Sequence, residues 1–526
     1  MKYGFAVRMC CLLLLLLSTA CGSDSAIRKK SDTIIIALST EPVRLNPLFL
    51  TDFNSYAVSE LIFRGLVKLD HKMKVTPDMA KSWEIRDSGR EIIFHLKENI
   101  LWHDGKNFTA EDVVFTYEKI VSPKTATPQA GRFGTVKNVR VIDKYTVSVR
   151  YSEPYGSALE SWTIGIIPKH IFQDKEDIND SSFDSNPIGT GPYRLKEWRR
   201  GQMLKLEAFR DFYNGKPKID NLIILIIPDA ASRMFELQSG GVDVMELSPE
   251  QYRYDKNYEK YFNKFKADAF RYGFLGLNLR DDRFKDKRVR QALDCAIDKQ
   301  AIIKIVLNGL GKISTGPYPS VAWYHNSSVQ PQEYNPAKAL RLLEVSGWKR
   351  NSQGVLEKNG KPFSFTILTN YESKENIKTA QLIQYNLKAI GIMTEIVQLE
   401  WMTFRYKTIG NRHFEAVVMS RAYLWDPDIY DLWHSSKTKE GEWNFLSYKN
   451  AELDTLLDKG RKTIDANVRR QIYQRVHSML FDDKACIFLY ETPLLFIAHK
   501  SIKGVKPSPK GFFHNAEEWY LDMRGN

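Results

Sequence analysis

PDMAKSWEIRDSGREIIFHLKENILWHDGKNFTAEDVVFTYEKI, residues 77–120, contains the pattern of a β-hairpin. Two apolar runs, 83–85 and 92–96, flank the turn sequence Asp87-Ser88-Gly89. Asp and Gly favour tight turns, because Asp can hydrogen-bond its own backbone and Gly adopts positive φ without steric cost. The pattern therefore predicts two antiparallel strands joined by a short turn.

A helix is expected after this hairpin. Thr109 and Asp112 stand three positions apart, which is the spacing of a capping box with Asp in place of Glu. Val113, Tyr117 and Ile120 then recur at helical spacing. The stretch as a whole predicts a small β-rich unit with one amphipathic helix.

On either side of this unit, apolar runs alternate with helical patterns. The run NLIILIIPD (221–229) is typical of a strand buried on both faces, and a helix at about 230–238 and a second strand should follow it. In the second half, a helix from Asn335-Pro336 to Gly347 precedes the strands FSFTILTN (363–370) and IMTEIVQL (392–399), with another helix between the two strands. Recurring strand-helix-strand units predict parallel sheets with flanking helices. Two α/β lobes and a β-richer insertion near 61–182 would account for the 526 residues.

The first residues have the pattern of a secretory signal peptide. Lys2 and Arg8 precede an apolar run that is too short for a stable membrane span, and small residues follow it. The sequence Leu-Ser-Thr-Ala-Cys that ends at Cys21 resembles a bacterial lipobox, with Ser18 in place of the usual Leu. We expect a signal peptide at 1–20, and a lipidated Cys21 with a flexible linker over 21–32. The sequence does not decide between an inner and an outer membrane.

The chain is basic, with a formal net charge of +13. Removal of residues 1–20 would take away Lys2 and Arg8 and no acid, so the charge would fall to +11. The basic residues are scattered and form no nucleic-acid motif. A basic surface beside an anionic membrane is the simpler interpretation, and no nucleic-acid partner is expected.

The familiar motifs of hydrolases, metalloproteases and nucleotide-binding proteins are absent from the sequence. It has no Gly-x-Ser-x-Gly, no His-Glu-x-x-His and no phosphate-binding Gly-rich loop with Lys-Ser/Thr. IGTGPY (188–193) and His103-Asp104-Gly105 are interpreted as structural turns. Cys295 and Cys486 stand in apolar surroundings typical of buried thiols, and whether they form a disulfide is left open. We expect neither enzymatic activity, nor a resident metal, nor a cofactor.

Many passages of the chain, in order from about 33 to about 500, resemble the oligopeptide- and dipeptide-binding proteins of bacterial ABC importers, called solute-binding protein family 5. The passage at 77–120 is specific to this group. The others are STEPVRLNPLF (39–49), IFRGLVKLD (62–70), NPIGTGPYRLKEW (186–198), LQSGGVDV (237–244), DKRVRQALDCAIDK (286–299), YNPAKALRLLEVSGW (334–348) and YKNAELDTLL (448–457).

The resemblance implies an α/β fold of the type II periplasmic-binding-protein class, with two lobes and an additional subdomain inserted in the first lobe. Lobe I would comprise 33–60, 183–284 and 491–526, the inserted subdomain 61–182, and lobe II 285–490. It also implies a mechanism without bond breaking. An open form captures a solute between the lobes, hinge bending closes them, and the closed form docks on a membrane permease powered by an ATPase.

The peptide-binding motif of this group is altered in the sequence. Peptide binders carry Trp-x-x-Asp-Tyr-x-Asp-Pro, whose first Asp pairs with the amino terminus of the peptide. When Asp426-Pro427 is aligned with the closing Asp-Pro, Ser420 falls at the Trp position, Tyr423 at the amine-binding Asp and Leu424 at the Tyr. Asp426 or Asp428 could substitute after a shift, or the ligand could lack a free amine.

The stretch RAYLWDPD (421–428) carries the main predictions of ligand contact. Tyr423 and Trp425 are expected to stack on a ligand, and the charged side chains Arg421, Asp426 and Asp428 to contact it. Glu41 and Asn278, in matching stretches of the first lobe, are two further candidates.

The expected protein is an exported, lipid-anchored monomer at the periplasm or cell surface, which captures peptides for ABC permease subunits with their ATPase. Relatives of the same fold take nickel chelates, haem, oligosaccharides or opines, and the aromatic residues would suit such ligands as well. A sensory or chaperone-like binder that is not coupled to transport is a further alternative.

Overall fold

The computed structural model describes residues 32–173, 178–179, 182–254, 257–422 and 426–522. The predicted signal peptide, Cys21 and the linker up to residue 31 lie outside the described residues, as do Tyr423 and Trp425. No helix among the described residues has both the length and the apolar character needed to cross a membrane.

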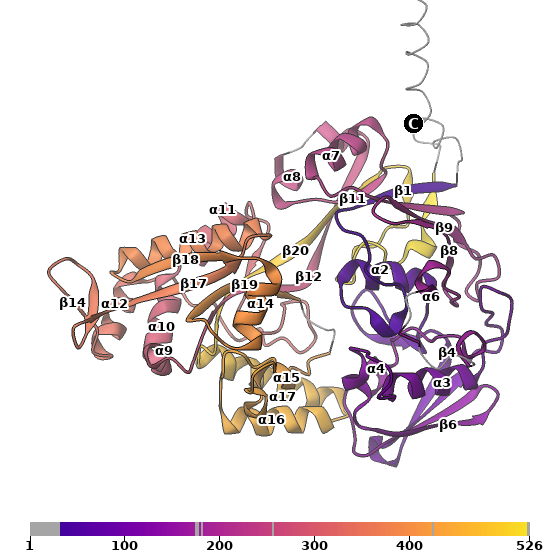
Figure 1. Cartoon of the computed structure of the whole chain (residues 1–526), viewed down its shortest axis with the longest axis horizontal. Helices are drawn as coiled ribbons and strands as arrows, with labels where there is room; N and C mark the ends of the chain where they lie inside the picture. The colour runs from indigo at the N-terminus through magenta and orange to yellow at the C-terminus, as the bar shows by residue number, and fades with distance from the viewer. Residues whose placement is uncertain (1–31, 174–177, 180–181, 255–256, 423–425, 523–526) are drawn as a thin grey trace, which may run out of the picture.

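Two long strands connect the two sides of the molecule. β12 (Phe262–Leu277) and β20 (Ile487–His499) pair antiparallel in the middle of an 11-stranded sheet. Ten of its strands follow the order β18-β17-β19-β12-β20-β11-β1-β10-β9-β8, and the eleventh, β13 (Lys312–Ile313), also pairs with β20. Their register is regular from Phe262↔His499 to Asp268↔Pro493 and shifts before Tyr272↔Glu491. Below, the β1 side means the residues before β12 and after β20, and the β17 side means those between the two strands (Figure 1).

On the β1 side, β1 (Thr33–Leu38) lies parallel to both β10 (Asn221–Ile226) and β11 (Val244–Glu246). The predicted strand-helix-strand unit is confirmed, since α7 (Ala230–Ser239) joins β10 to β11. The expectation that this strand is buried on both faces was wrong. Leu222 and Ile224 are fully buried in the main core, whereas Ile223 and Leu225 on the other face are partly exposed against a small apolar cluster.

The stretch 77–120 forms the predicted hairpin and helix. β4 (Ala80–Arg86) pairs antiparallel with β5 (Glu91–Leu96), which lies next to β7 (Thr146–Tyr151) and is followed in the sheet by β6 (Val136–Asp143). α3 (Ala110–Val121) begins with the predicted capping box of Thr109 and Asp112. The other strands of the β1 side are β2 (Val67–Leu69), β3 (Val75–Pro77), β8 (Tyr193–Arg199), β9 (Met203–Ala208), β21 (Ile502–Lys503) and β22 (Tyr520–Leu521). Its other helices are α2 (Phe53–Ile62), α4 (Ala158–Ser161), α5 (Lys169–Phe172), α6 (Ser182–Ser185), α8 (Pro249–Tyr254) and the short turns η2 (Pro47–Phe49), η3 (Asp87–Gly89), η4 (Ala130–Phe133), η5 (Asn257–Lys260) and η8 (Ala516–Glu518).

The β17 side repeats the strand-helix-strand pattern. β17 (Ser364–Asn370) and β18 (Met393–Leu399) are parallel, and α13 (Lys374–Ala389) connects them as predicted. β19 (Ala416–Ala422) adds a third parallel strand and then pairs antiparallel with β12, so the large sheet is mixed rather than parallel. The other elements are α9 (Asp282–Lys285), α10 (Lys287–Ala296), α11 (Lys299–Val306), β13 (Lys312–Ile313), α12 (Pro336–Val345), β14 (Lys349–Arg350), β15 (Leu356–Lys358), β16 (Lys361–Pro362), α14 (Trp401–Arg405), η6 (Tyr406–Gly410), α15 (Tyr430–Trp433), η7 (Ser435–Lys437), α16 (Ala451–Lys462) and α17 (Ala466–Asp482).

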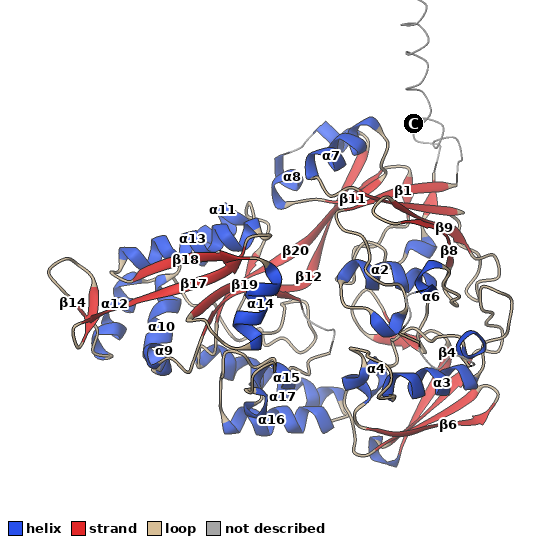
Figure 2. Ribbon diagram, in the orientation of Figure 1, coloured by secondary structure: helices blue, strands red, loops and turns tan. Residues whose placement is uncertain are grey.

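Helices and strands are distributed as expected of an α/β protein. α10, α12 and α13 pack in one hydrophobic cluster with side chains on one face of β17 and β19. β4–β7 form a separate sheet, which Figure 2 shows below α2. The predicted boundary at residue 490 falls within β20. The residue bounds of the lobes and of the inserted subdomain stay predictions.

The IGTGPY motif packs tightly against helix α2. A Cβ atom added to Gly189 or Gly191 would overlap the carbonyl groups at the end of this helix, at Leu61 and Ile62. His103 braces the motif, because its Nδ1 accepts a hydrogen bond from the Gly189 amide (3.2 Å) and its Nε2 donates to the Gly191 carbonyl (3.0 Å). Burial lowers the pKa of His103 to about 4, so the ring is neutral at pH 7. This geometry supports the interpretation of both motifs as structural turns.

Substitution of Gly189 by Ala tests this packing. The added methyl group has no space beside the Ile62 carbonyl, so Gly189→Ala should lower the free energy of unfolding by about 3 kcal/mol. Gly134→Ala is the matched control, since its Cβ would meet its nearest neighbour at an ordinary 3.6 Å. Urea denaturation measures both variants, and equal stability of the two would contradict this account.

Candidate functional site: a cavity between the two sides

A cavity of about 890 Å³ lies between the β1 side and the β17 side, and we call it the central cavity. Its volume is in the range typical of small-molecule sites. The β1 side contributes residues from α2, η4 and the segment 155–165. The β17 side contributes Trp401, Arg405, Ala422, Asp426, Asp428, Asp431, Trp443 and Arg461.

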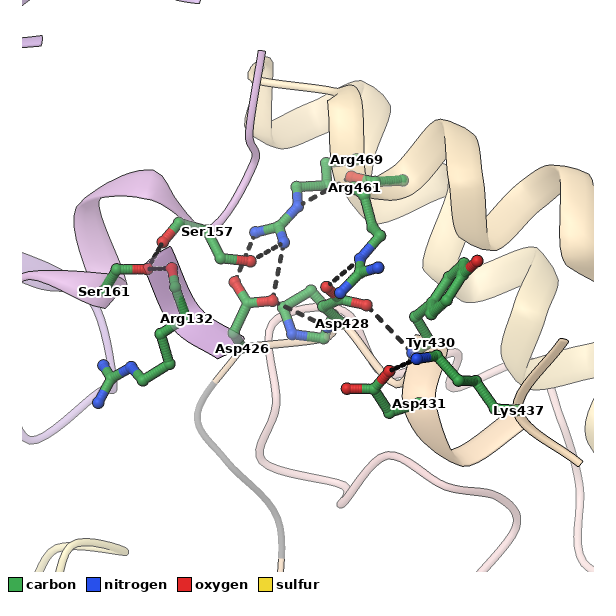
Figure 3. Close-up of polar contacts among 12 residues, drawn as sticks. Arg132, Ser157, Ser161, Asp426, Asp428, Tyr430, Asp431, Lys437, Arg461 and Arg469 are labelled. Atoms are coloured by element: carbon green, nitrogen blue, oxygen red, sulfur yellow. Dashed lines mark hydrogen bonds and ion pairs between the residues drawn. The ribbon is translucent and has the colours of Figure 1, made fainter. Parts of the chain in front are cut away.

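A buried ion pair closes one edge of the central cavity. Arg469 of α17 donates to both carboxylate oxygens of Asp426, at 2.8 Å each, and to the hydroxyl of Ser157 on the β1 side at 2.9 Å (Figure 3). Burial disfavours the charge on Arg469, but Asp426 compensates for it, and the pKa of Arg469 is raised. One guanidinium therefore joins the two sides.

A second set of contacts continues this seam. Arg461, near the end of α16, donates from Nε to Asp428 at 2.7 Å, and its carbonyl accepts a hydrogen bond from the Gly156 amide at 2.6 Å. Beside it, Lys462 and Glu153 form an ion pair of 2.7 Å. These contacts form a seam that joins residues 153–157 to residues 461–469. Residues of both segments also line the central cavity.

Two tryptophan rings also line the central cavity. Trp401 begins α14 and is 42% exposed, and Trp443 is 44% exposed. The guanidinium of Arg405 lies 5.6 Å from the Trp443 ring centre. α14 continues into a single turn of π-helix at η6, and such turns are frequent at functional sites. Large, partly exposed rings offer stacking surfaces with little conformational entropy to lose.

Of the predicted ligand contacts, Asp426 and Asp428 line the central cavity and Arg421, Glu41 and Asn278 do not. The guanidinium of Arg421 lies over the rings of Phe274 and Phe445.

The two candidates from the first lobe take part in packing. Glu41 accepts a hydrogen bond of 2.6 Å from the Trp198 indole. Asn278 is 7% exposed and donates a hydrogen bond of 2.8 Å to the Phe414 carbonyl. The ligand roles of all these residues stay predictions.

Several cavity residues were missed by the sequence reasoning. They are Tyr56, Arg132, Tyr155, Glu160, Trp401, Arg405, Trp443 and Arg461. The sequence signal for Glu160 was a lone acid within the apolar stretch ALESWTIGII (158–167). The other residues are brought to the cavity by the tertiary fold and carry no local signal.

The described residues contain no group of three or more His, Cys, Asp or Glu side chains arranged to hold a metal ion. Cys295 and Cys486 are both buried free thiols.

Comparison with known proteins identifies the family. Residues 74–443 match the family model for bacterial extracellular solute-binding proteins, family 5. The chain is 33% identical to the oligopeptide-binding protein AppA of Bacillus subtilis, over 97% of each chain. The solved structure of that protein in complex with a nonapeptide has a TM-score of 0.79, at 32% identity, and covers 93% of this chain and 99% of its own.

A second solved structure, of NikZ from Campylobacter jejuni in complex with Ni(L-His), has a TM-score of 0.80 at 30% identity, covering 93% of this chain and all of the other. The chain belongs to family 5 of the bacterial extracellular solute-binding proteins. Its fold is that of the type II periplasmic binding proteins, and its relatives are binding proteins of ABC importers rather than enzymes.

The Arg469–Asp426 ion pair should dominate the stability of the seam. Arg469→Met leaves the Asp426 carboxylate without its cation, so we expect a loss of about 3–5 kcal/mol in the free energy of unfolding. Arg470→Met on the same helix removes an exposed side chain and should cost less than about 0.5 kcal/mol.

The double variant Arg469→Met/Asp426→Asn should regain much of this loss, because the carboxylate is then neutral. Chemical denaturation of the four proteins measures the effect. A loss in Arg469→Met no larger than that in Arg470→Met would contradict the assignment.

Proposed function

We propose that this protein is an exported, lipid-anchored solute-binding protein that captures peptides in the central cavity and delivers them to ABC permease subunits. The observation that carries the proposal is the central cavity itself, which has walls from both sides of the molecule and a hydrogen-bonded seam at its edge. A ligand held there would contact both sides at once, so it would stabilise the closed form, in which the two sides lie close together. The peptide-binding relatives support peptides as the cargo.

Closure would occur by bending at β12 and β20. Residues 269–271 of β12 lie in the irregular part of its register with β20, between two regular stretches. A break in regular pairing is where strands bend most readily. The Arg469–Ser157 and Arg461–Gly156 hydrogen bonds would form on closing and separate on opening. A ligand drives this equilibrium only as far as it binds the closed form better than the open form.

A nickel chelate is the second candidate cargo, and the aromatic wall favours it. Trp401 and Trp443 offer flat surfaces for a planar or chelated ligand, and one related structure holds a nickel-histidine complex. Native mass spectrometry of the protein, purified without refolding, distinguishes the candidates. Peptide masses that dissociate on activation support the proposal, and a chelate or sugar mass with no peptide would overturn the cargo.

The Trp443 ring should contribute to ligand affinity. Trp443→Ala removes a stacking surface of the cavity, so we expect peptide affinity to fall roughly 3- to 10-fold, as for the loss of one aromatic contact. Tyr385→Ala is the control, since Tyr385 is 72% exposed and lies away from the central cavity. Calorimetric titration with a peptide found by mass spectrometry measures both variants, and equal affinities would contradict the role of Trp443.

Lipidation at Cys21 can be tested in cells. The full-length protein should partition into the detergent phase of a Triton X-114 extract and incorporate labelled palmitate. Cys21→Ser should move to the aqueous phase without label, because the thiol that accepts the lipid is gone. Cys295→Ser keeps Cys21 and should behave like the wild type. Detergent partition of Cys21→Ser equal to that of the wild type would refute the anchor.

A further inference from the structure

Five carboxylates line the central cavity, and four of them are already paired with cations of the protein. The paired groups are Glu60 with Lys510 (2.8 Å), Asp426 with Arg469 (2.8 Å), Asp428 with Arg461 (2.7 Å) and Asp431 with Lys437 (3.3 Å). The fifth, Glu160, forms no ion pair with any side chain that the structure describes. Glu160 is therefore the one cavity carboxylate without a cationic partner among the described residues.

The backbone of Glu160 is held firmly while its carboxylate is left available. Glu160 belongs to α4, and its carbonyl accepts hydrogen bonds from Arg132 Nη2 (2.7 Å) and from the Thr163 hydroxyl (2.8 Å). Ser161, the next residue, donates to the Arg132 carbonyl at 3.1 Å. Arg132 thus acts as a positioning residue, because it fixes the main chain of α4 without neutralising the carboxylate.

The surroundings make an unpaired charge on Glu160 costly. Burial, and then the charge of Asp426, raise the pKa of Glu160 to about 7, while Arg469 and Arg132 act in the opposite direction. Arg469 is already engaged in the bidentate pair with Asp426. A positive group that enters the cavity would compensate for the desolvation of Glu160 and favour its ionised form.

Asp426 and Asp428 are less suited to bind an incoming cation. Both oxygens of Asp426 already accept from Arg469, and Asp426 also accepts from the Asp428 amide. Asp428 accepts from Arg461 and from the Tyr430 amide. A ligand amine at either group would compete with a guanidinium that also stabilises the seam.

We propose that Glu160, on the β1 side of the central cavity, binds the protonated amino group of the ligand. This inference rests on the proposed function, since it assigns one contact within the same cavity. The shared chemistry is a primary ammonium ion, from either the amino terminus of a peptide or a lysine side chain. Glu160, which lies on the β1 side, would therefore favour ligands that carry a primary ammonium group.

The test compares three synthetic peptide pools on wild-type protein, Glu160→Gln and Asp431→Asn. The first pool has free amino termini and no lysine, the second is N-acetylated and lacks lysine, and the third is N-acetylated with one lysine in each peptide. Affinity selection with mass spectrometry measures enrichment. Asp431→Asn is the matched control, because it removes a cavity carboxylate that already has a partner and is 58% exposed.

Wild-type protein and Asp431→Asn should enrich peptides with an amino group over acetylated ones, roughly 10- to 100-fold, as expected of one charge-assisted hydrogen bond. Glu160→Gln should lose this preference and still bind peptides. Enrichment of the first or the third pool identifies the amino terminus or the lysine as the source. An equal preference in wild type and Glu160→Gln would overturn the assignment while leaving peptide binding intact. No binding of any pool to the wild type would overturn the proposed function, and the assignment with it.

The pH dependence gives a second readout. With a pKa of about 7, Glu160 is mostly ionised at pH 7.5 and mostly protonated at pH 6.0. Affinity for an enriched free-amine peptide should therefore fall roughly eightfold between these pH values, after allowance for titration of the peptide amine itself. Asp426, Arg469 and Arg132 are the charged groups that act on Glu160. Glu160→Gln should lack the decrease, and a decrease of the same size in this variant would contradict the assignment.

Discussion

The pairing of β12 with β20 is the constraint on which the rest of the structure depends. Within the 11-stranded sheet, β20 pairs with β11 of the β1 side, β12 pairs with β19 of the β17 side, and the two strands pair with each other. These two strands therefore link the β1 side to the β17 side. The central cavity has walls from both sides, and its seam joins them, so bending of β12 and β20 would change the distance between these walls.

The charged groups of the cavity follow a consistent pattern. Buried ion pairs such as Asp426–Arg469 contribute little net stability compared with apolar packing, but breaking one is costly. The Asp426–Arg469 pair holds the two sides together, because the guanidinium that neutralises Asp426 also donates a hydrogen bond to Ser157 across the seam. Glu160 departs from this pattern, because it forms no ion pair with the described side chains, and the proposed preference for an ammonium group rests on this difference.

The sequence predicts the local elements and much of the class. The hairpin of 77–120 and the Thr109 cap depend on residues close together in the chain, so their patterns are readable directly. The resemblance in the ordered passages also led to family 5, which the comparison established. The combination of parallel and antiparallel strands in the large sheet could not be predicted from the sequence, because the antiparallel pairing of β19 with β12 joins segments far apart in the chain.

The cavity was only partly predictable for the same reason. Asp426 and Asp428 were expected near the ligand, but their partners Arg469 and Arg461 lie 43 and 33 residues further along the chain. No local pattern connects these pairs, and no pattern indicates that Glu160 lacks one. Tertiary contacts decide which carboxylates lack a cationic partner. The sequence therefore indicates acidic residues near the ligand, but not which of them is unpaired.

A crystal structure of the protein with a bound peptide would show whether the central cavity is the binding site. We expect continuous peptide density inside the central cavity, in contact with both Trp443 and α4. The hydrogen bond between Arg469 and Ser157 should be present in this complex. Density on an outer surface, or contact with one side of the molecule and an open seam, would contradict this expectation.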